Sequence, residues 1–254
     1  MQTITSSSLD PQDPLFQPYP SMKLGVRESV RFYANLLVPL AEKIVASQPE
    51  TTDWVITAPP LYVIPAGANL IASAVFQKLR ERLPRSQSLR LVEMRYALPM
   101  PASTPELGGD YSNSDISARI RNRQRLHEGD GAPRPSLADF EGRAVLFIND
   151  INVTGTQQRY VQQTLDSVQP ASIHWMYIFQ VDRDLGRSNP GIEYALNFLN
   201  LGTFEEFAEV MASADIDYTS RCVSRLFGYS IESLEPLFRS LDVARRDLLL
   251  DLAT

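Results

Sequence analysis

The chain lacks most of the features that mark secreted, membrane-spanning or zinc-binding proteins. Its 254 residues include one cysteine, Cys222, which excludes an internal disulfide and fits a reducing compartment. No apolar run approaches the length of a membrane span, and the N-terminus lacks the basic-then-apolar order of a secretory signal. The two histidines, His127 and His174, do not have zinc-site spacing. We therefore expect a cytoplasmic protein that does not enter a membrane.

The overall charge points away from nucleic acid as a partner. Acidic residues outnumber basic ones, 30 against 24, and the formal net charge is −6. A protein that neutralises a phosphate backbone over a wide surface needs the opposite balance. We therefore expect no nucleic-acid partner, although a local basic site for a small phosphorylated ligand is compatible with this charge.

One stretch, residues 144–156, carries the strongest functional signal. An apolar run ends on the polar pair Asn149-Asp150, the sequence Thr154-Gly155-Thr156 follows shortly after, and residues 157–168 have a helical pattern. A buried strand, a tight loop and a helix N-terminus together form an anion site, because loop N–H groups and the helix dipole both favour negative charge. Glycine lets the backbone approach a phosphate closely. The stretch therefore predicts a sugar-phosphate site, with an ordinary turn capped by threonine as the alternative.

The rest of the chain predicts an α/β fold. Strands are expected near residues 53–58, 89–96, 143–149 and 172–181, and helices near 26–47 and 66–83. Such alternation indicates a mostly parallel central sheet with helices on both faces, and ligands at the carboxyl ends of its strands.

Three regions flank or interrupt this alternation. Residues 1–22, rich in Ser, Pro and Gln, are predicted to form an N-terminal arm that is disordered or packed as coil. Residues 97–135 form a long stretch rich in Pro, Gly, Ser, Asn and Asp, and a stretch of this length inside an α/β domain is usually functional or mobile. Residues 183–254 are predicted to form a helical appendage, with a capping box at Thr203–Glu206 and a final helical stretch, 231–250, that Pro236 interrupts.

Residues 144–156, with their surroundings from about 53 to 182, resemble the phosphoribosyl-diphosphate (PRPP) signature of type I phosphoribosyltransferases. The layout is most similar to the ComF-type group. The resemblance implies a phosphoribosyltransferase-like α/β domain over residues 23–182, with a hood at about 97–135. Two positions depart from the pattern, since Asn149 stands for the first acid and Gln157 for a hydroxyl residue.

The resemblance also implies a role for each residue of the signature. Asn149 and Asp150 would hold the ribose hydroxyls as catalytic residues, and Asp150 would contact Mg²⁺ through the ligand or water. The 5′-phosphate would be bound by the following loop, which comprises Ile151, Asn152, Val153, Thr154, Gly155, Thr156 and Gln157. Since valine cannot act as a base, Val153 excludes base catalysis at a position where several purine salvage enzymes carry an acid.

Two further segments have both a functional and a structural interpretation. The loop with Pro59, Pro60, Leu61 and Tyr62 follows the first expected strand, where similar enzymes bind diphosphate; alternatively it is a rigid turn, because prolines remove N–H donors. Arginines alternate along the hood at positions 119, 121, 123 and 125. On a strand all four would share one face, and Arg121 and Arg123 would neutralise diphosphate as catalytic residues; on a solvated helix they would not.

Two functions of different classes follow. The first is a phosphoribosyltransferase that binds PRPP or a nucleotide 5′-phosphate with Mg²⁺ and transfers phosphoribose to a nitrogen base or similar acceptor, with loss of diphosphate. The second is a non-catalytic regulator that binds PRPP or a nucleotide at the same site. The resemblance favours the enzyme and implies that a homodimer can form, whereas the acceptor has no signal in the sequence.

Overall fold

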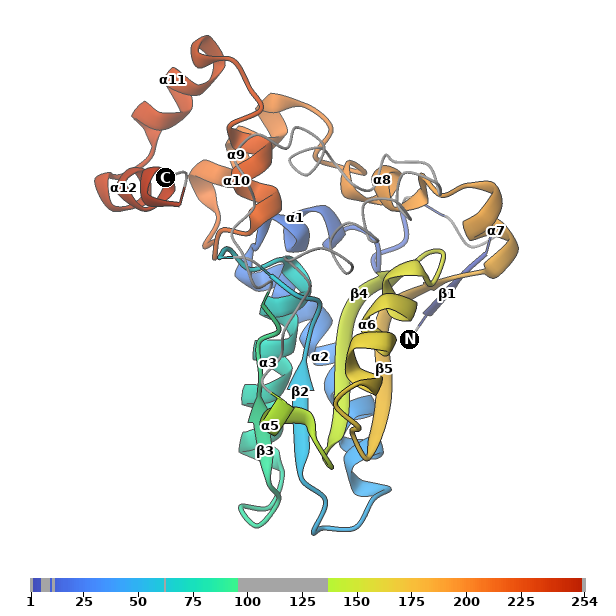
Figure 1. The fold of residues 1–254 in the computed structure, drawn as a ribbon. Helices are drawn as coiled ribbons and strands as arrows, with labels where there is room; N and C mark the ends of the chain where they lie inside the picture. The colour runs from blue at the N-terminus through green and yellow to red at the C-terminus, as the bar shows by residue number, and fades with distance from the viewer. Residues whose placement is uncertain (1, 6–9, 11, 62, 96–136, 253–254) are drawn as a thin grey trace.

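The protein is an α/β structure built on one parallel sheet, as the sequence predicts (Figure 1). The computed structural model describes residues 2–5, 10, 12–61, 63–95 and 137–252. Its strands are β1 (Gln2–Ile4), β2 (Trp54–Thr57), β3 (Leu89–Leu91), β4 (Ala144–Asn152) and β5 (Ser172–Val181). They lie in the order β1-β5-β4-β2-β3, and every neighbouring pair is parallel. Central β4 therefore has a strand on each side.

Helices cover both faces of the sheet. On one face lie α2 (Arg27–Ala46) and α3 (Gly67–Arg82), and on the other lie α5 (Leu137–Phe140) and α6 (Thr156–Asp166). Within β4, Leu146 and Ile148 join the first core, whereas Val145 and Phe147 join the second. Alternate residues of a strand point to opposite faces, so a strand covered twice is apolar throughout. This explains why the sequence of β4 is a continuous apolar run.

The N-terminal segment differs from the predicted disordered or coiled arm. Residues 2–4 form β1, which pairs with β5 at the edge of the sheet, and α1 (Tyr19–Leu24) follows. Phe16, Tyr19 and Met22 are fully buried. Residues 12–18 pack without forming a helix or strand, in line with the packed-coil alternative. The prediction missed β1 and α1 because it rested on the abundance of Ser, Pro and Gln, while a few large apolar side chains supply enough buried area to hold the segment in place.

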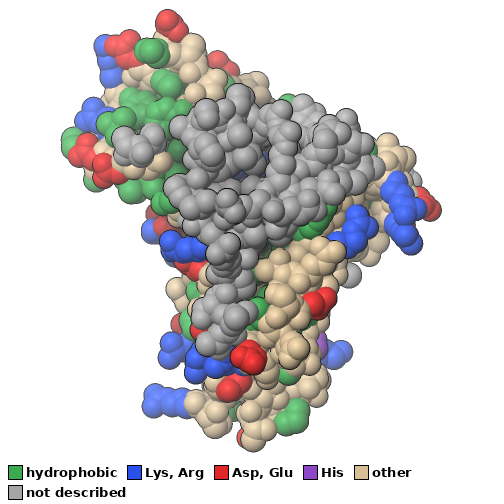
Figure 2. All heavy atoms as spheres, in the orientation of Figure 1, with side chains coloured by type: hydrophobic (Ala, Val, Ile, Leu, Met, Phe, Trp, Pro, Cys, Tyr) green, Lys and Arg blue, Asp and Glu red, His purple; other side chains and the backbone are tan. Residues whose placement is uncertain are grey.

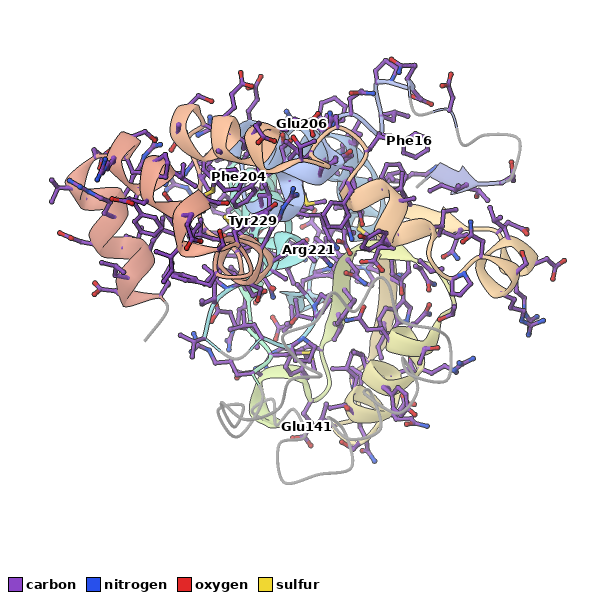
Figure 3. All side chains as sticks on the ribbon, turned by 90° about the horizontal axis from the view of Figure 1, so that it is seen from above. Phe16, Glu141, Phe204, Glu206, Arg221 and Tyr229 are labelled. Atoms are coloured by element: carbon purple, nitrogen blue, oxygen red, sulfur yellow. The ribbon has the colours of Figure 1, made fainter. Side chains whose placement is uncertain are left out.

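The C-terminal third is helical, as predicted. Its helices are α7 (Arg183–Ser188), α8 (Ile192–Asn197), α9 (Phe204–Ser213), α10 (Ser220–Leu226), α11 (Ile231–Ser240) and α12 (Val243–Asp251). The predicted capping box is present, with Thr203 N–H donating to the Glu206 carboxylate and Glu206 N–H donating to the Thr203 hydroxyl. Glu206 is labelled in Figure 3. The last helical stretch breaks at residues 241–242 rather than at Pro236, which lies inside α11. Asp242 causes the break by capping a new helix, because its side chain accepts the Arg245 N–H.

The helices α9 to α12 share a core of their own but are anchored to α1 and to the first residue of α2. The Thr219 hydroxyl donates to the Lys23 carbonyl at 2.7 Å, and the Arg27 guanidinium donates to both oxygens of Asp217 at 2.7 and 2.8 Å. Gly25, with φ of +99°, ends α1 between these contacts, and a Cβ there would lie 1.9 Å from the Asp217 carbonyl oxygen. Only glycine fits so close an approach.

The outer side of this helical group is partly apolar. Ile231, Val243, Leu248 and Leu250 are exposed on α11 and α12, and apolar side chains gather over that part of the surface in Figure 2. None of the described helices combines the length and apolar character needed to cross a membrane.

Candidate phosphate-binding site

The site is built on the turn between β4 and α6, at the carboxyl end of the central strand. Gly155 has φ of +72°, a conformation that disfavours residues with a side chain, and it is the N-cap of α6 without any side-chain cap. Within the described part of the chain, the backbone N–H groups of Gln157 and Gln158 have no acceptor. An uncapped N-terminus with free donors is the general form of an anion site.

Other donors in the same loop are already used. The Gly155 N–H donates to Asn152 Oδ1 at 2.9 Å, and the Thr156 N–H lies 3.4 Å from the Thr154 hydroxyl. Asn152 is held in turn by Gln158 and Gln180, both at 3.1 Å. A phosphate that used the full set of amides would have to replace the Asn152 carbonyl at Gly155. Some of the loop's N–H groups are thus already hydrogen-bonded within the protein, and only the remaining ones are open to a ligand.

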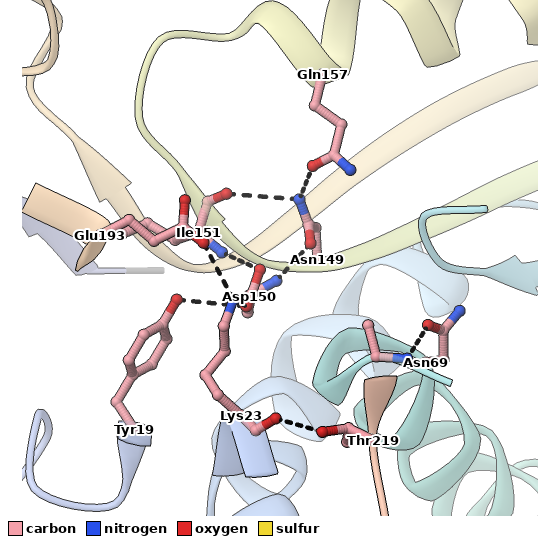
Figure 4. Close-up of polar contacts among 10 residues, drawn as sticks. Tyr19, Lys23, Asn69, Asn149, Asp150, Ile151, Gln157, Glu193 and Thr219 are labelled. Atoms are coloured by element: carbon pink, nitrogen blue, oxygen red, sulfur yellow. Dashed lines mark hydrogen bonds and ion pairs between the residues drawn. The ribbon is translucent and has the colours of Figure 1, made fainter. Parts of the chain in front are cut away.

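The two residues that depart from the family pattern, Asn149 and Gln157, contact each other. Asn149 Nδ2 donates to Gln157 Oε1 at 3.0 Å, and Asn149 Oδ1 accepts the Asp150 N–H at 2.9 Å (Figure 4). An acid at position 149 could not donate to the Gln157 carbonyl oxygen. The Asn149–Gln157 hydrogen bond therefore connects the end of β4 to the first turn of α6.

Asp150 is buried and its oxygens are occupied. Oδ2 accepts hydrogen bonds from Lys23 and from the Tyr19 hydroxyl, at 3.3 Å for Tyr19, and Oδ1 accepts the Ile151 N–H at 2.8 Å (Figure 4). Burial alone would raise the pKa of Asp150, but Lys23, the Ile151 N–H and the charge of Arg221 together hold that pKa below its ordinary value. Asp150 is therefore an ionised carboxylate inside a network of the protein's own groups.

The same geometry decides how a metal ion would fit. Lys23 Nζ lies 3.1 Å from Glu193 Oε1 in addition to its contact with Asp150, so an ammonium already occupies the space between the two carboxylates. The described residues include no group of three or more His, Cys, Asp or Glu side chains able to hold a metal. The residues present do not fit direct coordination of Mg²⁺ by Asp150.

Arg159 adds a positive charge beside the loop. Its guanidinium Nη2 lies 3.3 Å from the Thr156 hydroxyl, which in turn lies 2.9 Å from the Thr154 hydroxyl. The i, i+3 spacing on a helix places residues 156 and 159 on one face. A cation, two hydroxyls and a helix N-terminus thus converge at one point.

Two hollows adjoin these groups. The smaller, about 30 Å³, is lined by Asn149, residues 151–158, Tyr177 and Glu193, and has room for about two water molecules. The larger, about 460 Å³, runs along the exposed side of α6 past Gly155, Gln158 and Arg159. The larger hollow therefore leaves the loop accessible from the α6 side.

The proline loop after β2 offers few donors. Pro59 and Pro60 have no backbone N–H, and the Leu61 N–H donates to the Met94 carbonyl at 3.0 Å. Asn69 Nδ2 in turn donates to the Pro59 carbonyl at 3.0 Å. Tyr62 lies outside the described residues, as do Arg121 and Arg123 with the rest of the hood arginines. Pro59, Pro60 and Leu61 therefore present no free backbone donor to a diphosphate.

Sequence reasoning missed four residues that surround the predicted ones: Tyr19, Lys23, Arg159 and Glu193. Arg159 could have been found, because its spacing from Thr156 is helical. The other three lie more than 40 residues from Asp150 along the chain, and no local pattern connects them to it.

A parallel sheet with an uncapped helix N-terminus after its central strand is an arrangement at which α/β proteins commonly bind phosphate groups. The family comparison is more specific: residues 136–254 match the sequence model of the family described as PRTase ComF-like. This match confirms the predicted resemblance to ComF-type phosphoribosyltransferases over those residues. It also continues to residue 254, so the C-terminal helices lie within the matched segment.

Comparison with solved structures gives partial likenesses. A hypoxanthine phosphoribosyltransferase from Trypanosoma cruzi is 14% identical with a TM-score of 0.37, over 63% of this chain and 69% of that one. One from Staphylococcus aureus is 15% identical with a TM-score of 0.36, over 62% of this chain and 66% of that one. Similarity this low carries no conclusion about substrate. No curated protein sequence matches the chain.

Proposed function

We propose that this chain binds the 5′-phosphate of PRPP or of a nucleotide at the β4–α6 loop, and transfers phosphoribose to a nitrogen base or similar acceptor with loss of diphosphate. The observation that carries the binding step is the uncapped α6 N-terminus, where the N–H groups of Gln157 and Gln158 have no acceptor among the described residues and the Arg159 guanidinium lies beside them. The family match over residues 136–254 supports the transfer step.

In this proposal each part of the loop has a role. Thr154, Gly155, Thr156 and Gln157 bind the phosphate oxygens through backbone N–H groups and hydroxyls, and Asn149 lies at the ribose side of the site. Residues Ile151, Asn152 and Val153 form the wall of the smaller hollow. Because valine cannot take a proton, the transfer would depend on positioning and on charge stabilisation in the transition state. The proposal includes a homodimer, as the family resemblance implies.

A second function, a non-catalytic binder of the same ligand, is favoured by a specific observation. Asp150, which would hold ribose hydroxyls in an enzyme, is ion-paired with Lys23, and the described part of the proline loop has no free backbone donor for diphosphate. Such a site suits a ribose 5-phosphate group better than it suits a departing diphosphate.

Two measurements on the full chain separate these functions. The first is thermal stabilisation by PRPP, ribose 5-phosphate or nucleoside monophosphates, with unphosphorylated ribose as control. The second is diphosphate release from PRPP with a panel of nitrogen bases. Release supports the enzyme; stabilisation without release supports the binder; and neither effect with any of these ligands would refute both.

Matched variants localise the site. Thr154→Val and Arg159→Gln should each weaken ligand binding by about tenfold or more, because a hydrogen bond to a charged group contributes about 1.5–3 kcal/mol. Thr51→Val and Arg85→Gln are the controls, since both residues are exposed in turns that precede β2 and β3, at the opposite end of the parallel strands. Equal binding by all four variants would exclude the β4–α6 loop.

A further inference from the structure

The group Lys23, Asp150 and Glu193 occupies the point where a cation would be expected in a phosphoribosyltransferase-like site. Lys23 Nζ contacts Asp150 Oδ2 directly and Glu193 Oε1 at 3.1 Å, and the three side chains are between 9% and 12% exposed. Tyr19 completes the group with a hydroxyl 3.3 Å from the same Asp150 oxygen (Figure 4). One ammonium thus bridges two largely buried carboxylates.

Coordination of a divalent ion at this point would require Lys23 to leave. Mg²⁺ needs oxygen ligands at about 2.0–2.1 Å in octahedral geometry, but Asp150 Oδ1 accepts the Ile151 N–H and Oδ2 faces the ammonium. Lys23 makes two further contacts. Its carbonyl accepts the buried Thr219 hydroxyl, and its Nζ lies 5.5 Å from the centre of the Tyr19 ring.

We infer that Lys23 takes the place of a divalent cation at the carboxyl end of β4, so that ribose phosphate binding at the adjoining loop does not require Mg²⁺. The inference rests on the proposed function for its ligand, but the substitution of an ammonium for an ion is a property of the protein alone. The lysine comes from α1, outside the segment that matches the family, and α1 packs against α2, α3, α8 and α10.

The ligand arm of the test uses the wild-type chain and ribose 5-phosphate. Its dissociation constant, measured by titration calorimetry in Mg²⁺ and again in EDTA, should differ by less than about twofold. A loss of about tenfold or more in EDTA would overturn the inference. Absence of binding in both buffers would refute the proposed function instead, and the ligand-free arm would then decide the inference.

The ligand-free arm asks whether removal of the ammonium creates an ion site. In Lys23→Met, Asp150 and Glu193 are left without the cation between them, so the variant should bind Mn²⁺ and be stabilised by Mg²⁺. The wild type and Lys43→Met, which changes an exposed lysine of α2, should do neither. Electron paramagnetic resonance counts bound Mn²⁺ directly, without any activity assay.

The outcomes of this arm are distinct. Stoichiometric Mn²⁺ on the wild type would overturn the inference, and so would a folded Lys23→Met variant that gains no ion. If Lys23→Met does not fold without added ion, refolding it in Mg²⁺ is the alternative measurement: recovery of the native circular dichroism spectrum supports the inference, and failure to recover it contradicts the inference.

Discussion

Replacing Asp150 by asparagine should destabilise the protein strongly, although the two side chains have nearly the same shape. The wild-type carboxylate pairs with Lys23 and accepts from Tyr19, in a place where its side chain is 9% exposed. The asparagine would keep an oxygen for the Ile151 N–H but would bring no charge to the buried ammonium. Lys23 would retain only Glu193, at 3.1 Å.

The size of the effect follows from the burial of the pair. Removing one partner of a buried ion pair costs about 3–5 kcal/mol, because the remaining charge stays desolvated. Since Glu193 still neutralises part of that charge, we expect a loss near the lower end, about 3 kcal/mol. For a chain of this size each kcal/mol shifts the melting temperature by about 2–4 °C, so the drop should be about 6–12 °C.

A double-mutant cycle with Lys23→Met identifies the cause. Urea unfolding of wild type, Asp150→Asn, Lys23→Met and the double variant should give a favourable coupling energy of about 1–3 kcal/mol. Asp247→Asn, an exposed carboxylate on α12, is the control and should stay within about 0.5 kcal/mol of wild type. An Asp150→Asn variant as stable as that control, or a coupling energy near zero, would refute the buried-pair interpretation.

Three other predictions concern the loop, the acid response and the cysteine. Gly155→Ala should cost about 1–2 kcal/mol in urea unfolding because φ is +72°, whereas Gly202→Ala, without a positive φ, should cost less; equal losses would contradict this. The native pKa of Asp150 is lowered, so the stabilisation that its carboxylate contributes is present above about pH 4 and is lost as pH falls through that native pKa. Unfolding of Asp150→Asn by acid should therefore depend less steeply on pH than unfolding of the wild type. An unchanged pH dependence would count against the Lys23–Asp150 ion pair. Burial raises the pKa of Cys222 to about 12, so at about pH 8 a thiol reagent should label it only as fast as the helical group opens; immediate labelling of native protein would disprove that burial.

The sequence predicts the regular elements well where a single local pattern determines them. Strand β5 was expected at residues 172–181 and is found there, and the turn from β4 into α6 lies where the Thr-Gly-Thr sequence indicated. The predicted break at Pro236 was wrong by several residues. There, the capping oxygen of Asp242 decides the helix boundary and the proline is tolerated.

The sequence predicts the backbone part of the site but not its charged part, because only the backbone part is local in the chain. Its backbone donors are local, so glycine and threonine spacing reveals them. The charge environment of Asp150 is not local, because Lys23 and Glu193 arrive from α1 and α8 through the packing of the whole chain. The bond between Asn149 and Gln157 was equally hidden, although both residues were recognised as departures from the family pattern.

The placement of β1 and α1 has a practical consequence for anyone who shortens this protein. A chain starting at residue 25 would retain every residue of the family match, yet β5 would lose its outer neighbour at Phe179–Val181 and present unpaired peptide groups there. It would also lack the ammonium opposite Asp150 and the aromatic filling supplied by Phe16 and Tyr19. Such a truncation should therefore self-associate, which makes the first two dozen residues as much a part of the folding unit as the signature itself.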